Sequence, residues 1–316
     1  MSALASINRN KHPLRKDLRK HWMLYLVILA GLVYLAIFAY TPMVGIIIAF
    51  KRYKLSTGFA GFFTSPFVGL KWFKEFVTDY SFGSIIRNTL VISLLKLLIC
   101  FPLPIFFALM LNEMQHTGLK RLVQTVSYLP HFISWIIVTG ICNVLFNTYT
   151  GLINELLLKL GLAKEPLSIM VEGKYYYALA VLSDAWKETG WNAIIFIAAI
   201  AGVEPTLYEA AEIDGASRLQ RIRYVTLPCI RGTVVIMLIL ALGGLVNGNL
   251  EQARLMGNTQ NREYSDIIQS YVLRVGLNDL RFDYAAAVGL MQSVVSVILV
   301  FGSNIFCKRK LNASLY

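Results

Sequence analysis

Long apolar stretches alternate with short polar segments along almost the whole chain. Six of them approach or exceed the roughly 20 residues that an α-helix needs to cross a bilayer. These stretches cover residues 23–49, 88–112, 122–146, 176–202, 231–250 and 284–306. Because lipid offers no partners for backbone groups, stretches of this length must be helical. The pattern therefore predicts an all-α, polytopic membrane protein with six transmembrane helices.

The composition and the distribution of charge agree with this assignment. Hydrophobic residues make up 56% of the 316 residues and mean hydropathy is +0.58. Only 15% of residues are charged, against about 25% in soluble domains. The net charge of +12 would indicate nucleic acid in a soluble protein, but here Lys and Arg flank the apolar stretches, which is typical of cytoplasmic segments.

This charge pattern predicts how the chain is organised across the cell membrane. The cluster of Lys and Arg before the first apolar stretch places the N-terminus in the cytoplasm, and an even number of spans brings the C-terminus to the same side. We therefore predict a cytoplasmic N-terminal segment (1–22), one transmembrane permease-like domain (23–307) and a cytoplasmic tail (308–316).

A polar island at 203–230 separates the fourth and fifth apolar stretches. Thr206 and Glu209 fit the S/T-x-x-E capping box, in which two side chains bind free N–H groups at a helix start. Gly215 stands where a left-handed residue ends many helices. These signals predict a two-turn helix over 207–214 that docks onto another protein. The capping alone fits equally well a helix that only lies on the membrane surface.

The island also resembles the EAA motif of ABC importer permeases, E-A-A-x-x-x-G-x9-I-x-L-P. The matching positions are Glu209, Ala210, Ala211, Gly215, Leu227 and Pro228. Val225 stands where isoleucine is usual. Weaker likenesses to sugar permeases of the polysaccharide-uptake branch follow in the expected order at residues 40–51, 68–73, 87–89, 151–154 and 285–290. The chain is thus similar in plan to the maltose-permease-like type I importers.

This resemblance implies a type I ABC importer permease fold and several partner subunits. In that family the island is a coupling helix that seats in a groove of a cytoplasmic ATPase. The residues implied in ATPase coupling are Thr206, Tyr208, Glu209, Ala210, Ala211, Asp214, Gly215, Leu227 and Pro228. The implied partners are a second, homologous permease subunit, two copies of the ATPase, and an extracellular solute-binding protein that delivers an oligosaccharide.

The chain lacks the sequence signatures of covalent chemistry. It contains no G-x-x-x-x-G-K-[ST] loop for nucleotide phosphates, no H-E-x-x-H and no G-x-S-x-G. Its four histidines are scattered, and its four cysteines show no C-x-x-C spacing. We therefore predict no catalytic residue, no metal site and no cofactor on this chain, with ATP and Mg on the partner ATPase.

Polar side chains inside the apolar stretches are candidates for a substrate path, because such groups usually face water or the bundle interior. Sugars need hydrogen-bonding groups and flat apolar surfaces. Residues with this chemistry are Trp186, Lys187, Trp191, Asn192, Asn247, Asn249 and Gln292. For any one of them, interhelical hydrogen bonding or interfacial anchoring is the more economical interpretation. Asp184 and Lys187, three positions apart, would suit a local ion pair.

Two other classes of protein stay open at this point. An ion-coupled secondary transporter of a small polar solute would use Lys96, Asp184 and Glu188, but the chain shows no inverted repeat. A membrane enzyme would need convergent carboxylates or a metal motif, and neither is present.

The predicted function is the permease subunit of an ATP-driven importer of oligosaccharides. Lys and Arg are numerous in the predicted outer segments, including Arg87, Arg274 and Arg281. This excess fits an acidic oligosaccharide from complex glycans, and it fits equally a docking surface for the binding protein.

Overall fold

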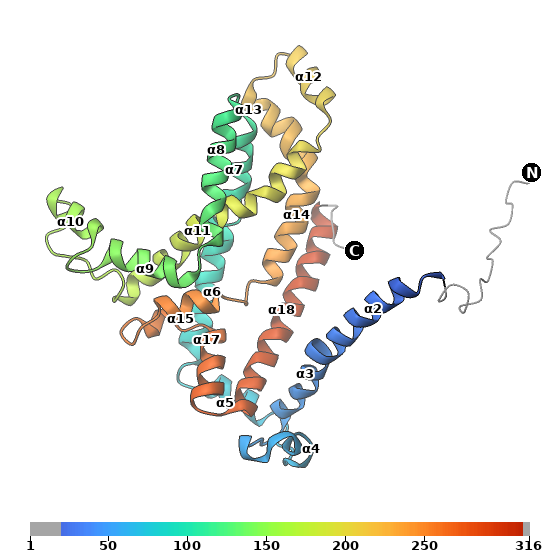
Figure 1. Ribbon diagram of the computed structural model, residues 1–316. Helices are drawn as coiled ribbons and strands as arrows, with labels where there is room; N and C mark the ends of the chain where they lie inside the picture. The colour runs from blue at the N-terminus through green and yellow to red at the C-terminus, as the bar shows by residue number, and fades with distance from the viewer. Residues whose placement is uncertain (1–19, 312–316) are drawn as a thin grey trace, which may run out of the picture.

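The computed structural model describes residues 20–311, which form helices joined by turns, with no strand in this range. The helices, in chain order, are α2 (Trp22–Leu35), α3 (Thr41–Val44), α4 (Gly61–Thr64), α5 (Lys71–Thr78), α6 (Phe82–Ile99), α7 (Pro102–Asn112), α8 (Thr117–Tyr128), α9 (Trp135–Phe146), α10 (Leu152–Lys159), α11 (Gly173–Ala201), α12 (Pro205–Ile213), α13 (Arg218–Arg221), α14 (Leu227–Gly243), α15 (Leu250–Met256), α16 (Arg262–Ser265), α17 (Ile268–Leu273) and α18 (Phe282–Leu311). They form an elongated bundle with α12 at one end and α4 and α5 at the other (Figure 1).

Four helical stretches in the described range are long and apolar enough to cross a membrane. They are Trp22–Phe50, Phe82–Asn112, Arg218–Gly243 and Phe282–Arg309. Two more candidates are bent pairs, Thr117–Phe132 with Trp135–Phe146 (102°) and Gly173–Ala201 with Pro205–Ile213 (72°), which brings the number to 6 if each pair is one span. The all-α membrane architecture predicted from the sequence is confirmed. The boundaries of the single domain stay a prediction. Most of the predicted terminal segments, 1–22 and 308–316, lies outside the described residues, which exclude 1–19 and 312–316.

Helix α11 is the central element of the bundle. Its 29 residues extend roughly 43 Å at about 1.5 Å per residue, which is enough to cross a bilayer. It packs against α6, α7, α8 and α14. Gly190 allows a close approach to α8, because a Cβ atom there would lie 2.0 Å from the backbone oxygen of Ser127.

Replacing Gly190 with alanine is therefore expected to destabilise the protein by about 1–3 kcal/mol, since the added methyl group forces α8 and α11 apart. Thermal unfolding of the purified protein measures this effect. Gly140→Ala on α9 is the matched control, because a Cβ atom there meets nothing within 4 Å. Equal melting temperatures for the two variants would contradict the close contact at Gly190.

The first helical stretch leaves the bundle (Figure 1). None of the residues of α2 is buried, and nothing in the most apolar window of Trp22–Phe50 is buried either. Within this chain its apolar surface is therefore uncovered and is available to lipid or to another membrane subunit.

The fifth span differs from its predicted boundaries. The sequence predicts 231–250 after a break at Pro228, whereas the helix runs from Arg218 to Gly243. A π turn over Ile222–Thr226 precedes the proline, and the Leu227 N–H binds the Ile222 carbonyl. The wider turn accommodates a residue that lacks an N–H group, so the helix continues. It ends instead at Gly243, and residues 244–249 are not helical.

The third span is broken rather than continuous. Helix α8 passes into a 3₁₀ turn, Leu129–Phe132, which contains Pro130, and α9 continues after the bend of 102°. The Lys187 ammonium on α11 donates to the carbonyl oxygens of Pro130 and His131 at 3.4 and 2.5 Å. Because helix ends leave carbonyl groups with free acceptor capacity, this buried lysine stabilises the break.

Candidate functional site

Helix α12 projects at the end of the bundle, on the turn between α11 and α13 (Figure 1). None of its 9 residues is buried, and Ile213 is 87% exposed. Leu219 and Tyr224, on the segment that follows, are also strongly exposed. Charged residues stand next to them in the sequence, at Glu212, Arg218 and Arg223. Exposed apolar groups of this kind are typical of protein-interaction surfaces.

The capping box predicted at the start of α12 is wrong. Pro205 occupies the first turn, Glu204 is the N-cap residue, and no side chain makes a capping hydrogen bond there. Thr206 and Glu209 therefore do not form the box, and the helix covers 205–213 instead of 207–214. Proline suits this position because its missing N–H would have no partner in the first turn anyway.

A capping box does occur at the next helix. The Ser217 side chain accepts from the Gln220 N–H, and the Gln220 side chain accepts from the Ser217 N–H. The sequence pattern Ser-x-x-Gln carries the same local signal as Thr-x-x-Glu. At α12, Pro205 begins the helix one residue before Thr206, so Thr206 lies inside the helix and is not its N-cap residue.

The end of α12 follows the prediction. Gly215 has φ of +75°, a conformation that favours glycine. Its N–H binds the Glu212 carbonyl at 3.0 Å, and the Ala216 N–H binds the Ala211 carbonyl at 2.9 Å. These two bonds form the Schellman motif, which satisfies the last carbonyl groups of the helix. The chain can therefore reverse within a few residues and return to the bundle.

Two side-chain contacts connect α12 to the segment that leads into α14. The hydroxyl groups of Tyr208 and the buried Thr226 lie 3.0 Å apart, and Arg221 lies 3.4 Å from the Glu212 carboxylate. Thr226 belongs to the π turn immediately before Leu227 and Pro228, the first residues of α14. These contacts join α12 to the start of α14. The other predicted coupling residues are exposed on α12 or the turn after it, except Ala211, which is half-buried; they are Thr206, Glu209, Ala210, Ala211, Asp214 and Gly215.

A cavity of about 940 Å³ lies between α6, α11, α14, α17 and α18, within the size range of ligand-binding cavities. Four of the predicted substrate-path residues line it, namely Asn192, Asn247, Asn249 and Gln292. The charged side chains in its wall are Lys96, Asp184 and Glu251. The structure thus brings together amide and charged groups from distant parts of the chain.

The other three predicted path residues do not line this cavity. Lys187 is buried and bound to the carbonyl groups at the break of the third span. Trp186 is half exposed outside the cavity. Trp191 stacks on His131, with ring centroids 4.4 Å apart and an interplanar angle of 2°. In this conformation Lys187 and Trp191 have packing and anchoring contacts instead.

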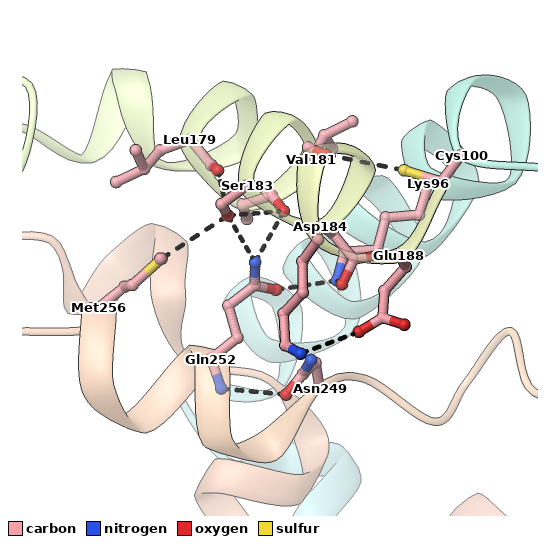
Figure 2. Close-up of polar contacts among 12 residues, drawn as sticks. Lys96, Cys100, Leu179, Val181, Ser183, Asp184, Glu188, Asn249, Gln252 and Met256 are labelled. Carbon is pink, nitrogen blue, oxygen red and sulfur yellow. Dashed lines mark hydrogen bonds and ion pairs between the residues drawn. The ribbon is translucent and has the colours of Figure 1, made fainter. Parts of the chain in front are cut away.

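A polar network crosses the wall of the cavity (Figure 2). The Lys96 ammonium on α6 lies 3.0 Å from the Asp184 carboxylate on α11, and it donates to the Gln252 side-chain oxygen at 2.8 Å. The Gln252 amide donates to the Ala180 carbonyl and the Ser183 hydroxyl at 2.8 and 2.9 Å. Helices α6, α11 and α15 are therefore joined by one network.

This network corrects one prediction and adds a residue that sequence reasoning missed. The expected pair between Asp184 and Lys187 is wrong, because Asp184 pairs with Lys96 and Lys187 lies 3.5 Å from Glu188. Gln252 was not recognised as important. Its local signal is the Asn249-x-x-Gln252 spacing, since Asn249 caps α15 by accepting from the Gln252 N–H at 3.0 Å.

The amides at the break after α14 also hold helices together. The Gln292 amide on α18 donates to the Val246 carbonyl at 3.1 Å and to the Asn247 side-chain oxygen at 2.9 Å. Asn247 and Asn249 thus lie in the non-helical segment between α14 and α15, and not at the end of a span as predicted. These contacts fix an irregular segment that lines the cavity, where exposed backbone is tolerated in a membrane protein.

The charged groups of α11 all have partners. Glu188 lies 2.7 Å from the His131 ring and 3.5 Å from the Lys187 ammonium, while Asp184 is paired with Lys96. Among residues 20–311, no group of three or more His, Cys, Asp or Glu side chains could hold a metal ion.

Comparison with known proteins places these features in a family. The family model for the inner membrane component of binding-protein-dependent transport systems matches residues 100–310. Protein LplB of Bacillus subtilis (strain 168) is 43% identical over 92% of this chain and 90% of its own length. The polygalacturonan/rhamnogalacturonan transport system permease protein YteP of the same organism is 42% identical over 90% of this chain and 88% of its own.

Solved structures agree with the sequence relatives. A chain of a bacterial ABC transporter involved in the import of the acidic polysaccharide alginate is 35% identical, with a TM-score of 0.86 over 94% of this chain and 99% of that one. A bacterial alginate ABC transporter in complex with an alginate pentasaccharide-bound periplasmic protein matches with a TM-score of 0.85 at 34% identity, over 95% of this chain and 99% of that one. These matches favour an importer permease over an ion-coupled secondary transporter, and the chain belongs to the family of inner membrane components of binding-protein-dependent ABC transporters.

Proposed function

We propose that this permease forms one half of the membrane pathway of an importer for oligosaccharides, including acidic ones, from complex glycans. The observation that carries the proposal is α12, a helix with no buried residue that is tied to α14 through Tyr208 and Thr226. The substrate class is supported by the relative that transports polygalacturonan and rhamnogalacturonan and by the likeness to alginate importers.

Several partners complete the complex. A second permease subunit encloses the other half of the path, and the uncovered surface of α2 supports such a neighbour. Two ATPase copies, which hold ATP and Mg, dock on the α12 helices from the cytoplasm. The N- and C-termini lie on that same side. A solute-binding protein delivers the sugar from outside, as the periplasmic protein of the alginate complex suggests.

The transport step is a shift between two conformations of the bundle. Closure of the ATPase dimer on ATP moves α12, and Tyr208 and Arg221 transmit the movement to the segment before α14. Helix α14 lines the cavity, so its displacement alters access to the space beside Asn192, Asn247 and Asn249. These amides offer hydrogen bonds to sugar hydroxyl groups. ATP drives the shift because the two conformations differ in affinity for the nucleotide.

The test is uptake of a labelled oligogalacturonide by proteoliposomes that contain the permease pair and the ATPase, with binding protein in the external medium and ATP inside. We expect uptake that requires both ATP and the ATPase subunit. Uptake that follows a proton gradient and ignores ATP would contradict the proposal and indicate a secondary transporter.

A further inference from the structure

A second cavity, of about 430 Å³, lies beside α15, α16 and α17, away from the α12 end of the bundle (Figure 1). Its wall carries three arginines, Arg254, Arg262 and Arg274, and one acidic residue, Asp266. The function described above gives this cavity no role.

The cavity has an excess of positive charge. Arg274 is paired with the Asp266 carboxylate and lies over the Tyr271 ring at 5.2 Å. Arg254 and Arg262 are exposed, and neither has an ion-pair partner within residues 20–311. Two guanidinium groups are therefore left to bind an anion from outside the chain. Arginine presents a planar fork of donors that matches a carboxylate group with two parallel hydrogen bonds.

The cavity of about 940 Å³ described above, called the membrane cavity from here on, has the opposite charge. Its wall contains one cation, Lys96, and two carboxylates, Asp184 and Glu251, so this chain contributes a net negative charge there. Leu273, on α17, lines both cavities, so the two cavities adjoin at this helix. The positively charged cavity thus adjoins the negatively charged one in the part of the bundle that lies away from α12 (Figure 1).

The second cavity, called the arginine cavity from here on, is formed by a loop that buried amides hold in place. Asn261 donates to the carbonyl groups of Met170 and Met256 at 3.2 and 3.1 Å, and it is buried. The Asn88 amide on α6 donates to the Asp266 carbonyl at 2.9 Å. A wall that is already ordered loses little conformational entropy when a ligand binds, which favours recognition.

Uncharged polar groups lie between the arginines. Asn258, Thr259, Ser270 and Asn278 all line the cavity. The side chains of Asn258 and Ser270 already form hydrogen bonds within the protein, so Thr259 and Asn278 are the groups that would meet sugar hydroxyls, beside the arginines that meet carboxylates.

We propose that this cavity binds the carboxylate groups of an acidic oligosaccharide at the entrance of the pathway, so that Arg254 and Arg262 select uronate-bearing substrates. The inference rests on the proposed function and deepens it by assigning the recognition of charge to a site outside the membrane cavity. A surface for acidic side chains of the binding protein is the competing assignment, and the experiment separates the two.

The experiment measures the affinity of trigalacturonate for the assembled transporter in nanodiscs, without the binding protein, by isothermal titration calorimetry. We expect Arg254→Gln/Arg262→Gln to weaken binding at least about tenfold, because each charge-assisted hydrogen bond to a carboxylate is lost. Lys164→Gln is the matched control, since Lys164 is also exposed but does not line the cavity. The carboxyl-reduced trisaccharide should bind wild type and double variant equally.

Three results would overturn the inference. They are an unchanged affinity in the double variant, no measurable binding of trigalacturonate to wild type up to millimolar concentration, and weaker association of the binding protein with unchanged affinity for the sugar. The last result would assign the arginines to protein docking. Uptake by the wild-type proteoliposomes is measured separately. If the arginine cavity does not bind the sugar but uptake still requires ATP, the inference is wrong and the proposed function stands.

Discussion

Changing Glu209 to lysine is expected to lower ATP-driven uptake at least about 30-fold and to release the ATPase from the purified complex. Reversal of a charge inside a protein interface costs about 2 kcal/mol or more, which corresponds to this factor. Glu209 is exposed on α12, and its side chain makes no hydrogen bond or ion pair within residues 20–311. The substitution therefore leaves the fold of this chain intact, and its effect arises in the contact with the ATPase.

Uptake by proteoliposomes and the ratio of ATPase to permease after purification measure this effect. Glu165→Lys is the control, because Glu165 is also exposed and lies on the loop after α10, far along the chain from α12. The control should keep uptake within about twofold of wild type, since an isolated surface charge contributes little. Normal uptake by Glu209→Lys would show that α12 does not dock onto the ATPase.

Removing Lys96 alone should lower the free energy of unfolding by about 3 kcal/mol or more. Lys96→Met leaves the Asp184 carboxylate largely buried without its partner, which is the costly outcome for a buried ion pair. The same variant removes the donor to Gln252. The double variant Lys96→Met/Asp184→Leu should recover most of the loss, because neither charge is then left uncompensated.

Chemical unfolding of the complex in detergent gives the free energies for this double-mutant cycle. Lys159→Met is the control, since Lys159 forms an exposed pair with Glu155, and solvent screening leaves such pairs with little effect on stability. If the free energy lost in the double variant equalled the sum of the losses in the two single variants, Lys96 and Asp184 would not interact in the folded protein.

The features that the sequence predicted well are those with local causes. Each apolar stretch is recognisable on its own because the hydrophobic contribution of its residues is additive along the segment. The left-handed turn at Gly215 is equally local, since glycine adopts φ of +75° at low cost. All four amides predicted for the substrate path, Asn192, Asn247, Asn249 and Gln292, do line the membrane cavity, because polar groups in lipid turn inward.

The features that sequence reasoning missed depend on contacts between distant residues. Asp184 pairs with Lys96, 88 positions earlier in the chain, instead of with its near neighbour Lys187. The break in the third span is stabilised by Lys187 from α11, which no rule based on neighbouring residues can anticipate. Pro228 did not end a helix, because the π turn before it removes the need for its N–H group.

The central claim is that α12 docks onto the ATPase. Its most direct test places a photo-reactive amino acid at Ile213, the strongly exposed end of α12, in the assembled transporter. The same substitution at Leu162, which is strongly exposed on the loop after α10, is the control. We predict that irradiation joins position 213, and not position 162, to the ATPase subunit, as shown by mass spectrometry of the adduct. An adduct between position 162 and the ATPase, or none at position 213, would contradict the account.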